Sequence, residues 1–403
     1  MRVLVLSESY PTPEHPGRAV FLEEQFRALA AAGVSPVVLF PRPFWPGVDS
    51  RRLEPRARRF EGRAWTPRAD DPPVQRPDYF YVPRLRSVRA WSLGRLCERE
   101  IERIGPDLLH VHWFGPAATA GAAVARRTGL PLVITAHAGD VYRELDVPRL
   151  RRSALRAGAT ASRIIAVAPH LAARLGSLPG LASKIRVVPN GVEESRFRPV
   201  PREEARRRLG WPTVGRVVLY AGQLVAAKGV LDLIEAFLAL TANGMDRGSL
   251  RLVIAGTGPL TERIGARLRD ALACGTAQFC GWQDHERMAD LLNAADVFVL
   301  PSYGEGNPVT VLESLCCGTP VVGTAIPALA EILNPPRDGA LVPPGRPQEL
   351  MEALRGLLTD PPDRNRIAAA AHARYGWTSV ARRIVDVYAE ACESPPGAAR
   401  DGR

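Results

Sequence analysis

The sequence predicts an α/β protein with two doubly wound domains, each built around a parallel sheet. Three features predict this class. Short apolar segments alternate with amphipathic stretches of about 10–15 residues. The alternation runs through the chain in two series, and a polar segment with several prolines separates them. Strands that alternate with helices form βαβ units, and such strands are apolar throughout because helices cover both faces of a parallel sheet.

The first series occupies the N-terminal half and predicts a Rossmann-like domain over residues 1–190. Its expected strands are Arg2–Ser7, Val34–Phe40, Leu108–His112, Leu132–Thr135, Ile164–Val167 and Ile185–Val188. The helical patterns that lie between several of these strands are Phe21–Ala32, Ala117–Arg127 and His170–Leu175.

The second series predicts another Rossmann-like domain, over residues 191–375. Its expected strands are Arg216–Tyr220, Leu250–Ala255, Gln278–Cys280, Val297–Leu300, Pro320–Val322 and Ala340–Val342. Its expected helices are Gly229–Leu240, Leu260–Leu272, His285–Asn293, Val309–Cys317 and Gln348–Leu358.

The segment Pro189–Pro201 is the expected link between the two domains, because it is polar and contains Asn-Gly and three prolines. Residues 376–403 follow the second series. We expect a last helix there, Gly376–Ala391, that packs back toward the N-terminal domain, and then a frayed polar tail.

Composition excludes several classes of protein. The chain has 403 residues, of which 46% are hydrophobic, and this apolar content excludes a disordered chain. No apolar run reaches the roughly 18–20 residues of a membrane-spanning helix. The apolar stretch at the N-terminus is too short for a signal peptide, which predicts a cytoplasmic protein. The six cysteines show no C-x-x-C spacing, so we expect reduced, buried thiols and no zinc site.

Positive charge is concentrated in the N-terminal half. Residues 1–190 contain 29 Lys+Arg and 17 Asp+Glu, a balance of +12, whereas the remainder contains 24 and 25, a balance of −1. Residues 41–95 alone hold thirteen arginines, six acids and interleaved aromatic residues. Prolines interrupt this segment, which predicts irregular loop with a short strand near Phe80–Val82. It is either a solvated insertion or a surface for anionic partners.

The most informative motif is PSYGEGNPVTVLE, residues 301–313, which follows an apolar strand and opens a helix. Asn307 suits the N-cap and Pro308 the first helical position. Backbone N–H groups at such a helix start favour an anion. The two acids Glu305 and Glu313 would repel a phosphate but accept hydrogen bonds from hydroxyls, so the motif favours a sugar nucleotide. On spacing alone, two solvated acids are the better-supported interpretation.

Two further loops follow strands in the second series. The segment 220–229, YAGQLVAAKG, places Gly222 where backbone could approach a ligand and Lys228 where an ammonium could meet a diphosphate. Lys228 is one of only two lysines among 53 basic residues, which favours a functional role over an ordinary surface position. The glycine turn around Gly258 is explained equally well by loop geometry.

In the first series, histidines stand at the ends of two expected strands. His110 and His112 end one strand, and His137 follows the next. Ligands bind at the carboxyl ends of strands in open α/β sheets. A single histidine at such a place is more often structural, but three of the seven histidines gather here. Gly17 lies in the loop after the first strand and could also approach a ligand.

Together these segments resemble the retaining glycosyltransferases of family 4, also called glycosyl transferases group 1, which have the GT-B fold. The resemblance covers nearly the whole chain and rests on the Glu-x7-Glu motif from Glu305 to Glu313 and on the order of the other segments. VLYAGQLVAAKGV resembles the diphosphate loop of the family, and TAHAGD resembles its His-Gly-x-Asp region. The resemblance implies two Rossmann-like domains that face each other across a cleft.

The resemblance also implies residue roles. Glu313 would hold the ribose hydroxyls and Glu305 the hydroxyls of the donor sugar, while Lys228 would bind the diphosphate and His137 the sugar. Glu305, Lys228 and His137 are thus the implied catalytic residues. The implied donor-binding set is Gly17, Gly222, Gln223, Lys228, Gly258, Trp282, Glu305, Gly306, Asn307, Val309 and Glu313. His112 and Asp140 are implied on the acceptor side. One departure is Gln223, which stands where the family usually has an arginine.

The expected reaction is transfer of a hexose-type sugar from a nucleoside diphosphate sugar to a hydroxyl, with retention. Asp-x-Asp is absent from the sequence, so we expect no metal and no other cofactor. The charge of the N-terminal half favours an anionic, lipid-linked acceptor in polysaccharide or glycolipid assembly, reached by peripheral contact with an anionic membrane. Glycosylation of a small soluble natural product is the alternative. A nucleic-acid-binding protein is a more distant one, because it leaves the two glutamates without a use. A dehydrogenase is disfavoured because G-x-G-x-x-G does not follow the first strand.

Overall fold

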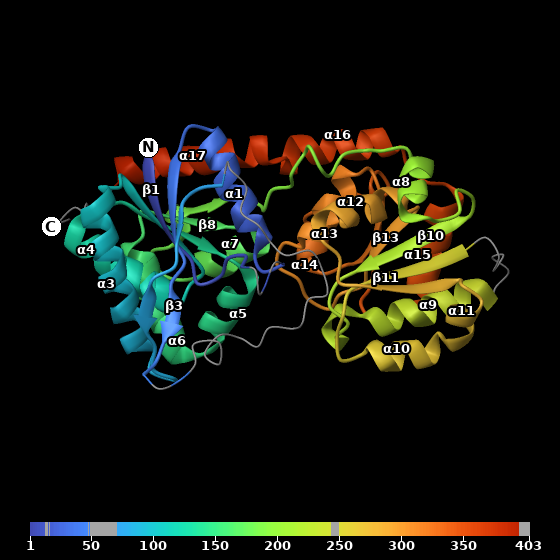
Figure 1. The fold of residues 1–403 in the computed structure, drawn as a ribbon, viewed down its shortest axis with the longest axis horizontal. Coiled ribbons are helices and arrows are strands. Elements are labelled where there is room, and N and C mark those ends of the chain that lie inside the picture. Colours follow the sequence, from blue (N-terminus) through green and yellow to red (C-terminus); the bar gives the residue numbers. More distant parts are fainter. Residues whose placement is uncertain (13–14, 16, 47, 49–70, 243–249, 395–403) are drawn as a thin grey trace. The chain divides into compact units, whose positions relative to one another are not determined.

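The computed structural model describes residues 1–12, 15, 17–46, 48, 71–242 and 250–394. The chain forms two compact units (Figure 1). The first contains the described part of residues 1–190 together with the segment that begins at Trp377, and the second is Gly191–Gly376. Each unit has a parallel sheet with helices around it, which confirms the predicted fold class of two Rossmann-like domains.

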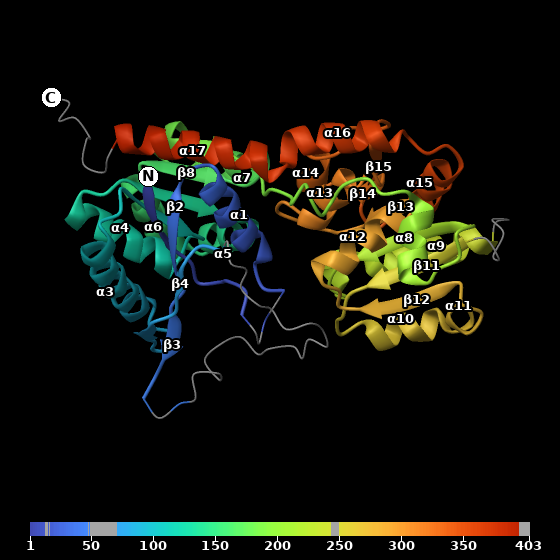
Figure 2. The same cartoon turned by 45° about the horizontal axis from the view of Figure 1, so that its top comes forward.

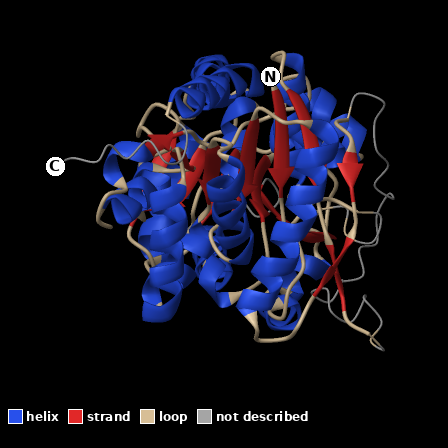
Figure 3. Ribbon diagram, turned by 90° about the vertical axis from the view of Figure 1, so that its left-hand side faces the viewer, coloured by secondary structure: helices blue, strands red, loops and turns tan. Residues whose placement is uncertain are grey.

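In the described part of the first unit, a seven-stranded parallel sheet has the order β4-β2-β1-β6-β7-β8-β9. Figure 3 shows these strands between helices. The strands are β1 (Arg2–Leu6), β2 (Ser35–Leu39), β4 (Val74–Gln75), β6 (Leu108–His112), β7 (Leu132–Ala136), β8 (Arg163–Ala166) and β9 (Ile185–Val187). The helices are α1 (Val20–Ala31), α3 (Arg86–Ile104), α4 (Pro116–Thr128), α5 (Ala138–Asp146), α6 (Pro148–Thr160), α7 (Pro169–Gly176) and α17 (Trp377–Glu393), with a 3₁₀ turn at Ala182–Lys184.

The C-terminal helix α17 belongs to the first unit and lies beside α1 (Figure 2). Its apolar face, which includes Trp377, Val380 and Ile384, packs into the same buried cluster as Val3 and Val5 of β1. Burial of such a face is the main source of stability for a helix of this kind.

In the second unit, the described residues form a six-stranded parallel sheet with the order β12-β11-β10-β13-β14-β15. The strands are β10 (Arg216–Ala221), β11 (Leu250–Ala255), β12 (Ala277–Gly281), β13 (Val297–Leu300), β14 (Val321–Thr324) and β15 (Gly339–Val342). The helices are α8 (Arg202–Leu209), α9 (Val230–Ala242), α10 (Thr261–Arg267), α11 (Arg269–Ala273), α12 (His285–Ala294), α13 (Val309–Cys316), α14 (Pro327–Ala330), α15 (Pro347–Thr359) and α16 (Arg364–Tyr375), with a 3₁₀ turn at Ala226–Lys228.

The arginine-rich segment 41–95 is more ordered than the sequence predicted. Strands β3 (Arg42–Phe44) and β5 (Asp78–Phe80) pair in parallel, and α3 already begins at Arg86. The helix forms because Ala90, Leu93 and Cys97 repeat at helical spacing and are buried. The charged residues between them obscured this pattern in the sequence. The part of the predicted loop at residues 47 and 49–70 lies outside the described residues.

Two smaller predictions were wrong, and two helices of the first unit were not predicted. The expected helix Leu260–Leu272 is interrupted at Leu268, which separates α10 from α11. The helices α5 and α6 were not predicted, because glycines and Pro148 interrupt the helical pattern of that stretch. The cysteines are unpaired, but Cys274 and Cys392 are exposed rather than buried.

Candidate functional site

The loop between β13 and α13 carries the first predicted acid. Glu305 lies in this loop and is half-buried. The helix α13 begins at Val309, and Pro308, whose ψ of 103° is extended, is its N-cap. The prediction of Asn307 as N-cap was therefore wrong by one residue, because helical backbone starts only after the proline. Gly306, Asn307 and Val309 lie at this helix start, as the motif predicted.

The structure brings Lys228 and Glu305 together. The Lys228 Nζ lies 2.5 Å from Glu305 Oε1, and the hydroxyl of Ser302 donates to the same oxygen over 2.6 Å. Lys228 follows β10 and Glu305 follows β13, two neighbouring strands of the sheet. Residues that are 77 positions apart thus share one site at the carboxyl edge. Ser302 is fully buried and was missed by the sequence analysis, because an isolated serine carries no pattern.

Backbone contacts hold the two loops against each other. The N–H of Tyr303 donates to the carbonyl of Ala227 over 3.0 Å. Gly229, with φ of 62°, packs so closely that an added Cβ would overlap the Pro301 carbonyl oxygen. A third loop packs in the same way, since a Cβ on Gly258 would overlap the Leu224 carbonyl. These glycines are therefore explained by loop packing, whatever else they contact.

Three other predicted donor residues lie in loops that follow strands of the second unit's sheet. Gln223 is exposed. Its backbone carbonyl accepts a hydrogen bond from the Tyr220 hydroxyl over 2.8 Å. Gly222 is half-buried beside it. Trp282 follows β12 and is also half-buried, and its carbonyl accepts a bond from Gln283 Nε2 over 2.9 Å.

The second predicted acid, Glu313, lies on α13 with 3% of its surface exposed. Its Oε1 is 3.9 Å from Nδ1 of His285, the first residue of α12. The sequence analysis did not select His285. A carboxylate this buried is costly unless it is paired or hydrogen-bonded, so the structure disfavours the interpretation of Glu313 as a solvated surface acid.

In the first unit, the histidines do gather at the carboxyl edge of the sheet. The rings of His112 and His137 share a hydrogen bond of 3.3 Å between Nδ1 and Nε2. His110 bonds Thr135 Oγ1 at 2.7 Å and the Tyr388 hydroxyl at 2.8 Å. Tyr388 comes from α17, so its place here could not be read from the local sequence.

Asp140 fixes the backbone around His137. One carboxylate oxygen accepts from the N–H of His137 over 2.9 Å, and the other accepts from the N–H of Phe114 over 2.6 Å. His137 is the N-cap of α5, and Asp140 lies in the first turn of that helix. The role of Asp140 that the structure shows is thus to join β6 and β7 at their ends. Gly17 lies exposed in the turn before α1.

Burial dominates the electrostatics of this cluster. It lowers the pKa of His110 and of His137 to about 3, and lowers the pKa of His112 well below the ordinary value, where the neighbouring histidines add to the effect. Burial also raises the pKa of Asp140 to about 7, against the backbone N–H groups that favour its ionised form. The three imidazoles are therefore neutral at pH 7, and they can act as hydrogen-bond donors or acceptors rather than as cations.

Comparison with known proteins identifies relatives of both units. Residues 17–196 match the family described as Glycosyltransferase Family 4, and residues 201–374 match Glycosyl transferases group 1. The glycosyltransferase TuaC of Bacillus subtilis strain 168, named for teichuronic acid biosynthesis, is 31% identical over 88% of each chain. A D-inositol 3-phosphate glycosyltransferase of Acidothermus cellulolyticus is 34% identical over 71% of this chain and 67% of its own length.

Solved structures share the fold at low sequence identity. A sucrose-phosphate synthase from Thermosynechococcus elongatus superimposes with a TM-score of 0.73 at 22% identity, and the match covers 97% of this chain and 99% of that chain. Anabaena Alr3699/HepE, solved in complex with UDP, gives 0.71 at 19% identity, with coverage of 96% and 100%. The fold of these neighbours and the matches along both units lead to one conclusion: the chain belongs to the group 1 glycosyltransferases, a family of the GT-B fold.

Proposed function

We propose that this glycosyltransferase moves a hexose-type sugar from a nucleoside diphosphate sugar to a hydroxyl acceptor, with retention at the anomeric carbon. The observation that carries the proposal is the grouping of Lys228, Glu305 and Ser302 at the carboxyl edges of β10 and β13. The ammonium of Lys228 can bind a diphosphate, and the carboxylate of Glu305 can accept hydrogen bonds from sugar hydroxyls. The pair therefore suits a ligand in which a diphosphate is attached to a sugar.

In the proposed reaction, Lys228 moves from Glu305 to the diphosphate and Glu305 turns to the sugar hydroxyls. The bond from the anomeric carbon to the β-phosphate oxygen breaks, and the acceptor oxygen bonds to that carbon on the same face. The acceptor proton passes to the leaving phosphate. Lys228 and the backbone N–H groups near Gly306 stabilise the growing negative charge, and fixed groups of this kind contribute about 3–4 kcal/mol each to transition-state stability.

We further propose that transfer needs no metal ion. The chain lacks the Asp-x-Asp pattern, and the ammonium of Lys228 is available to do the work of a divalent cation at the diphosphate. Gln223 leaves this site with one positive charge fewer than the family usually provides, so the proposal assigns the charge stabilisation to Lys228 and the helix start of α13. Addition of a chelator should leave the transfer rate unchanged.

The donor and the acceptor are proposed from the relatives and from charge. HepE has been solved with UDP-glucose, which supports a uridine nucleotide sugar as the first donor to examine. The name of the inositol relatives specifies a phosphorylated acceptor, and TuaC is named for a cell-wall polymer. Together with the +12 balance of residues 1–190, these favour an anionic acceptor, lipid-linked, in polysaccharide or glycolipid assembly.

A lipid-linked acceptor requires contact with a membrane surface. Within the described residues, no helix combines the length and the apolarity needed to cross a bilayer. Exposed large apolar side chains nevertheless concentrate in one part of the first unit, where Phe44 is 43% exposed, Phe80 39% and Trp91 65%. Phe44 and Phe80 are paired in register on β3 and β5. Exposed aromatic side chains in an arginine-rich stretch of sequence are typical of surfaces that lie in the headgroup region.

A small soluble acceptor is the second candidate. A 2-deoxystreptamine N-acetyl-D-glucosaminyltransferase of Streptomyces fradiae is 31% identical over 75% of this chain and 78% of its own length. Its name gives 2-deoxystreptamine, a small molecule, as the acceptor. This relative keeps natural-product glycosylation as the alternative if no membrane contact is found.

The proposed function is tested by a thermal-shift screen of UDP-, GDP-, ADP- and dTDP-sugars. We expect one nucleotide sugar to raise the melting temperature of the full chain and Lys228→Ala to abolish that shift. The matched control is Lys184→Ala, which removes the other lysine of the chain and lies in the first unit. This control should keep the shift. A shift that survives in Lys228→Ala contradicts the proposed donor site.

A further inference from the structure

A group of arginines surrounds Glu8 at the carboxyl edge of the first unit's sheet. Glu8 follows β1, and its Oε1 lies 2.7 Å from Arg89 Nη2. The guanidinium of Arg18 donates to the Glu8 carbonyl over 3.4 Å. Arg86 and Arg143 lie close enough to act on the Glu8 carboxylate through their charge. We call Arg18, Arg86, Arg89 and Arg143 the arginine cluster.

A second carboxylate holds part of this cluster in place. Glu144 of α5 is fully buried. Its Oε2 accepts from Arg86 Nη2 over 2.7 Å, and its Oε1 accepts from Arg143 Nε over 3.3 Å. The four guanidinium groups of the cluster thus face two carboxylates, those of Glu8 and Glu144, which leaves a positive balance. Burial raises the pKa of Glu8, against the charges of Arg89, Arg86 and Arg143, which lower it.

The cluster keeps donors for a further anion. A guanidinium carries five N–H donors, and Arg86 and Arg143 each use one nitrogen in their contacts with Glu144. Their side chains are 39% and 62% exposed, so solvent and ligands reach them. Gly115, the N-cap of α4, lies beside the cluster, since a Cβ added to this glycine would be 3.4 Å from Arg86 Nη2. The positive end of this 13-residue helix adds to the field.

The helix α5 connects the arginine cluster to His137, because His137 is its N-cap and it carries Glu144, the carboxylate that pairs with Arg86. His137, Asp140 and Glu144 follow one another on α5 at spacings of three and four residues, so they share one face of the helix. At 1.5 Å per residue, His137 and Glu144 are about 10 Å apart along the axis. This separation suits a molecule in which one sugar ring lies between a phosphate and a reacting hydroxyl.

We propose that the arginine cluster binds the phosphate group of the acceptor and thereby selects acceptors in which a sugar or polyol carries a phosphate ester. The inference rests on the proposed function for the identity of the ligand as an acceptor. The phosphate can belong to a free sugar phosphate or to a lipid-linked sugar, because both present the same group to the guanidinium donors.

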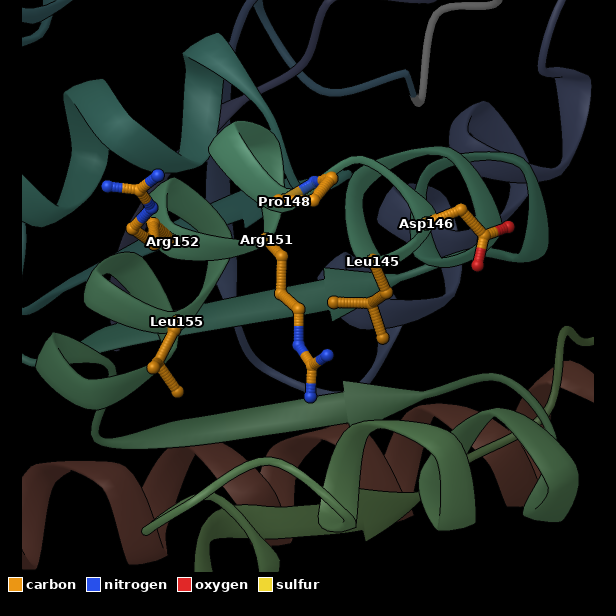
Figure 4. Close-up of a pocket in the computed structure, with 6 residues that line it drawn as sticks. All are labelled: Leu145, Asp146, Pro148, Arg151, Arg152 and Leu155. Carbon is orange, nitrogen blue, oxygen red and sulfur yellow. The ribbon is translucent and has the colours of Figure 1, made fainter.

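A hollow with two other arginines, shown in Figure 4, provides the control. It has a volume of about 340 Å³ between α5 and α6 and is lined by Leu145, Asp146, Pro148, Arg151, Arg152 and Leu155. Arg151 and Arg152 lie on α6, outside the contacts that define the cluster. If anions bind this protein through net charge alone, Arg151→Gln should weaken binding as much as a change in the cluster.

The experiment measures binding of glucose 6-phosphate to the full chain by calorimetry. Arg143→Gln is the main variant, because Arg143 is exposed and Arg86 still holds Glu144 after the change. We expect about tenfold weaker binding, as for the loss of one charge-assisted hydrogen bond, recovery of most of it in Arg143→Lys, and no change in Arg151→Gln. Unchanged binding in Arg143→Gln, or equal loss in Arg151→Gln, overturns the proposal.

Two further arms separate the outcomes. Every titration is repeated in the Lys228→Ala background, so that phosphate bound at the donor site is not counted. Phosphatidylcholine vesicles with and without polyprenyl phosphate then distinguish a lipid-borne phosphate from a free one. If nucleotide sugars fail to stabilise the chain while Arg143-dependent binding persists, the proposed function fails and the anion site stands. The reverse result removes the anion site alone.

Discussion

Ser302 shows how a single buried hydroxyl can set the state of a charged site. Its donation to Glu305 Oε1 fixes the same oxygen that Lys228 approaches. Without the hydroxyl, the carboxylate has one fewer partner and greater freedom to remain paired with the ammonium. Ser302 is thus a positioning residue for Glu305, and its effect should appear in donor binding.

We predict that Ser302→Ala weakens nucleotide-sugar binding about tenfold, which corresponds to the loss of one hydrogen bond to a charged group. The measurement is the dissociation constant of the donor found in the thermal screen. Ser314→Ala is the matched control, because Ser314 is also fully buried but donates to the Thr319 carbonyl. Equal weakening in both variants would indicate a general loss of packing instead.

The buried histidines predict loss of stability in acid. Each group whose pKa is lowered by folding stabilises the native state above its unfolded pKa near 6.5, and this contribution is lost as pH falls toward the folded pKa. For His110 and His137 that window runs from about 6.5 to about 3, at about 1.4 kcal/mol per pH unit for each group. Asp140 has the opposite sign, because its raised pKa favours the folded state as it takes up a proton.

We therefore expect the melting temperature to fall from pH 6.5 to pH 4 and the slope to become smaller in His110→Gln. Thr135→Val is the control: it removes a hydrogen bond from His110 but leaves the imidazole, so it should lower stability without flattening the slope. Calorimetry over this pH range provides the measurement. An unchanged slope in His110→Gln would show that this imidazole does not titrate on unfolding.

At the scale of elements, the site of the second unit depends on how closely two loops pack. The loop after β10 and the loop after β13 contact through backbone at Gly229 and Pro301. Because β10 and β13 are neighbouring parallel strands, both loops lie at the same edge of the sheet. The backbone of Gly229 can approach Pro301 this closely only because glycine has no Cβ. The position of Lys228 relative to Glu305 follows from that contact.

Gly229→Ala should lower both stability and donor binding. The added methyl overlaps the Pro301 carbonyl, and the residue keeps a positive φ of 62°, so we expect a cost of at least about 1–3 kcal/mol. Gly275→Ala is matched in backbone strain, with φ of 75°, but has no atom within 4 Å of its added methyl. Chemical denaturation of both variants separates the overlap from the strain. Equal destabilisation would remove the packing argument.

At the scale of the whole molecule, the uneven charge distribution favours association of the first unit with an anionic surface. Six of the exposed large apolar residues in the described chain fall between Phe44 and Trp91. Arginines near an anionic leaflet contribute about 1 kcal/mol each, and this attraction weakens as salt rises. The aromatic side chains add an apolar contact that salt does not screen.

We expect the chain to bind phosphatidylglycerol vesicles at low salt and to release them as salt rises, with clearly weaker binding in Trp91→Ser. The control is Tyr303→Ser, because Tyr303 is 50% exposed but belongs to the second unit. Co-sedimentation with vesicles measures both. A chain that ignores anionic vesicles at low salt would favour the small soluble acceptor.

The sequence by itself determined the fold class, because apolar strands in a parallel sheet and amphipathic helices leave separate periodic signals. It also determined the candidate residues of the loops, since Lys228, Glu305 and Glu313 follow strands in the expected order. The sequence did not predict the start of α3, because arginines interrupt the apolar repeat of Ala90, Leu93 and Cys97.

Only the tertiary structure decided which of these residues meet. Lys228 and Glu305 are 77 residues apart, and His110 and Tyr388 are 278 apart. The order of strands in each sheet brings such residues together, and no local pattern specifies that order. The same reason explains Ser302 and the arginine cluster, whose members come from different segments and acquire a joint role only when the strand ends align at one edge.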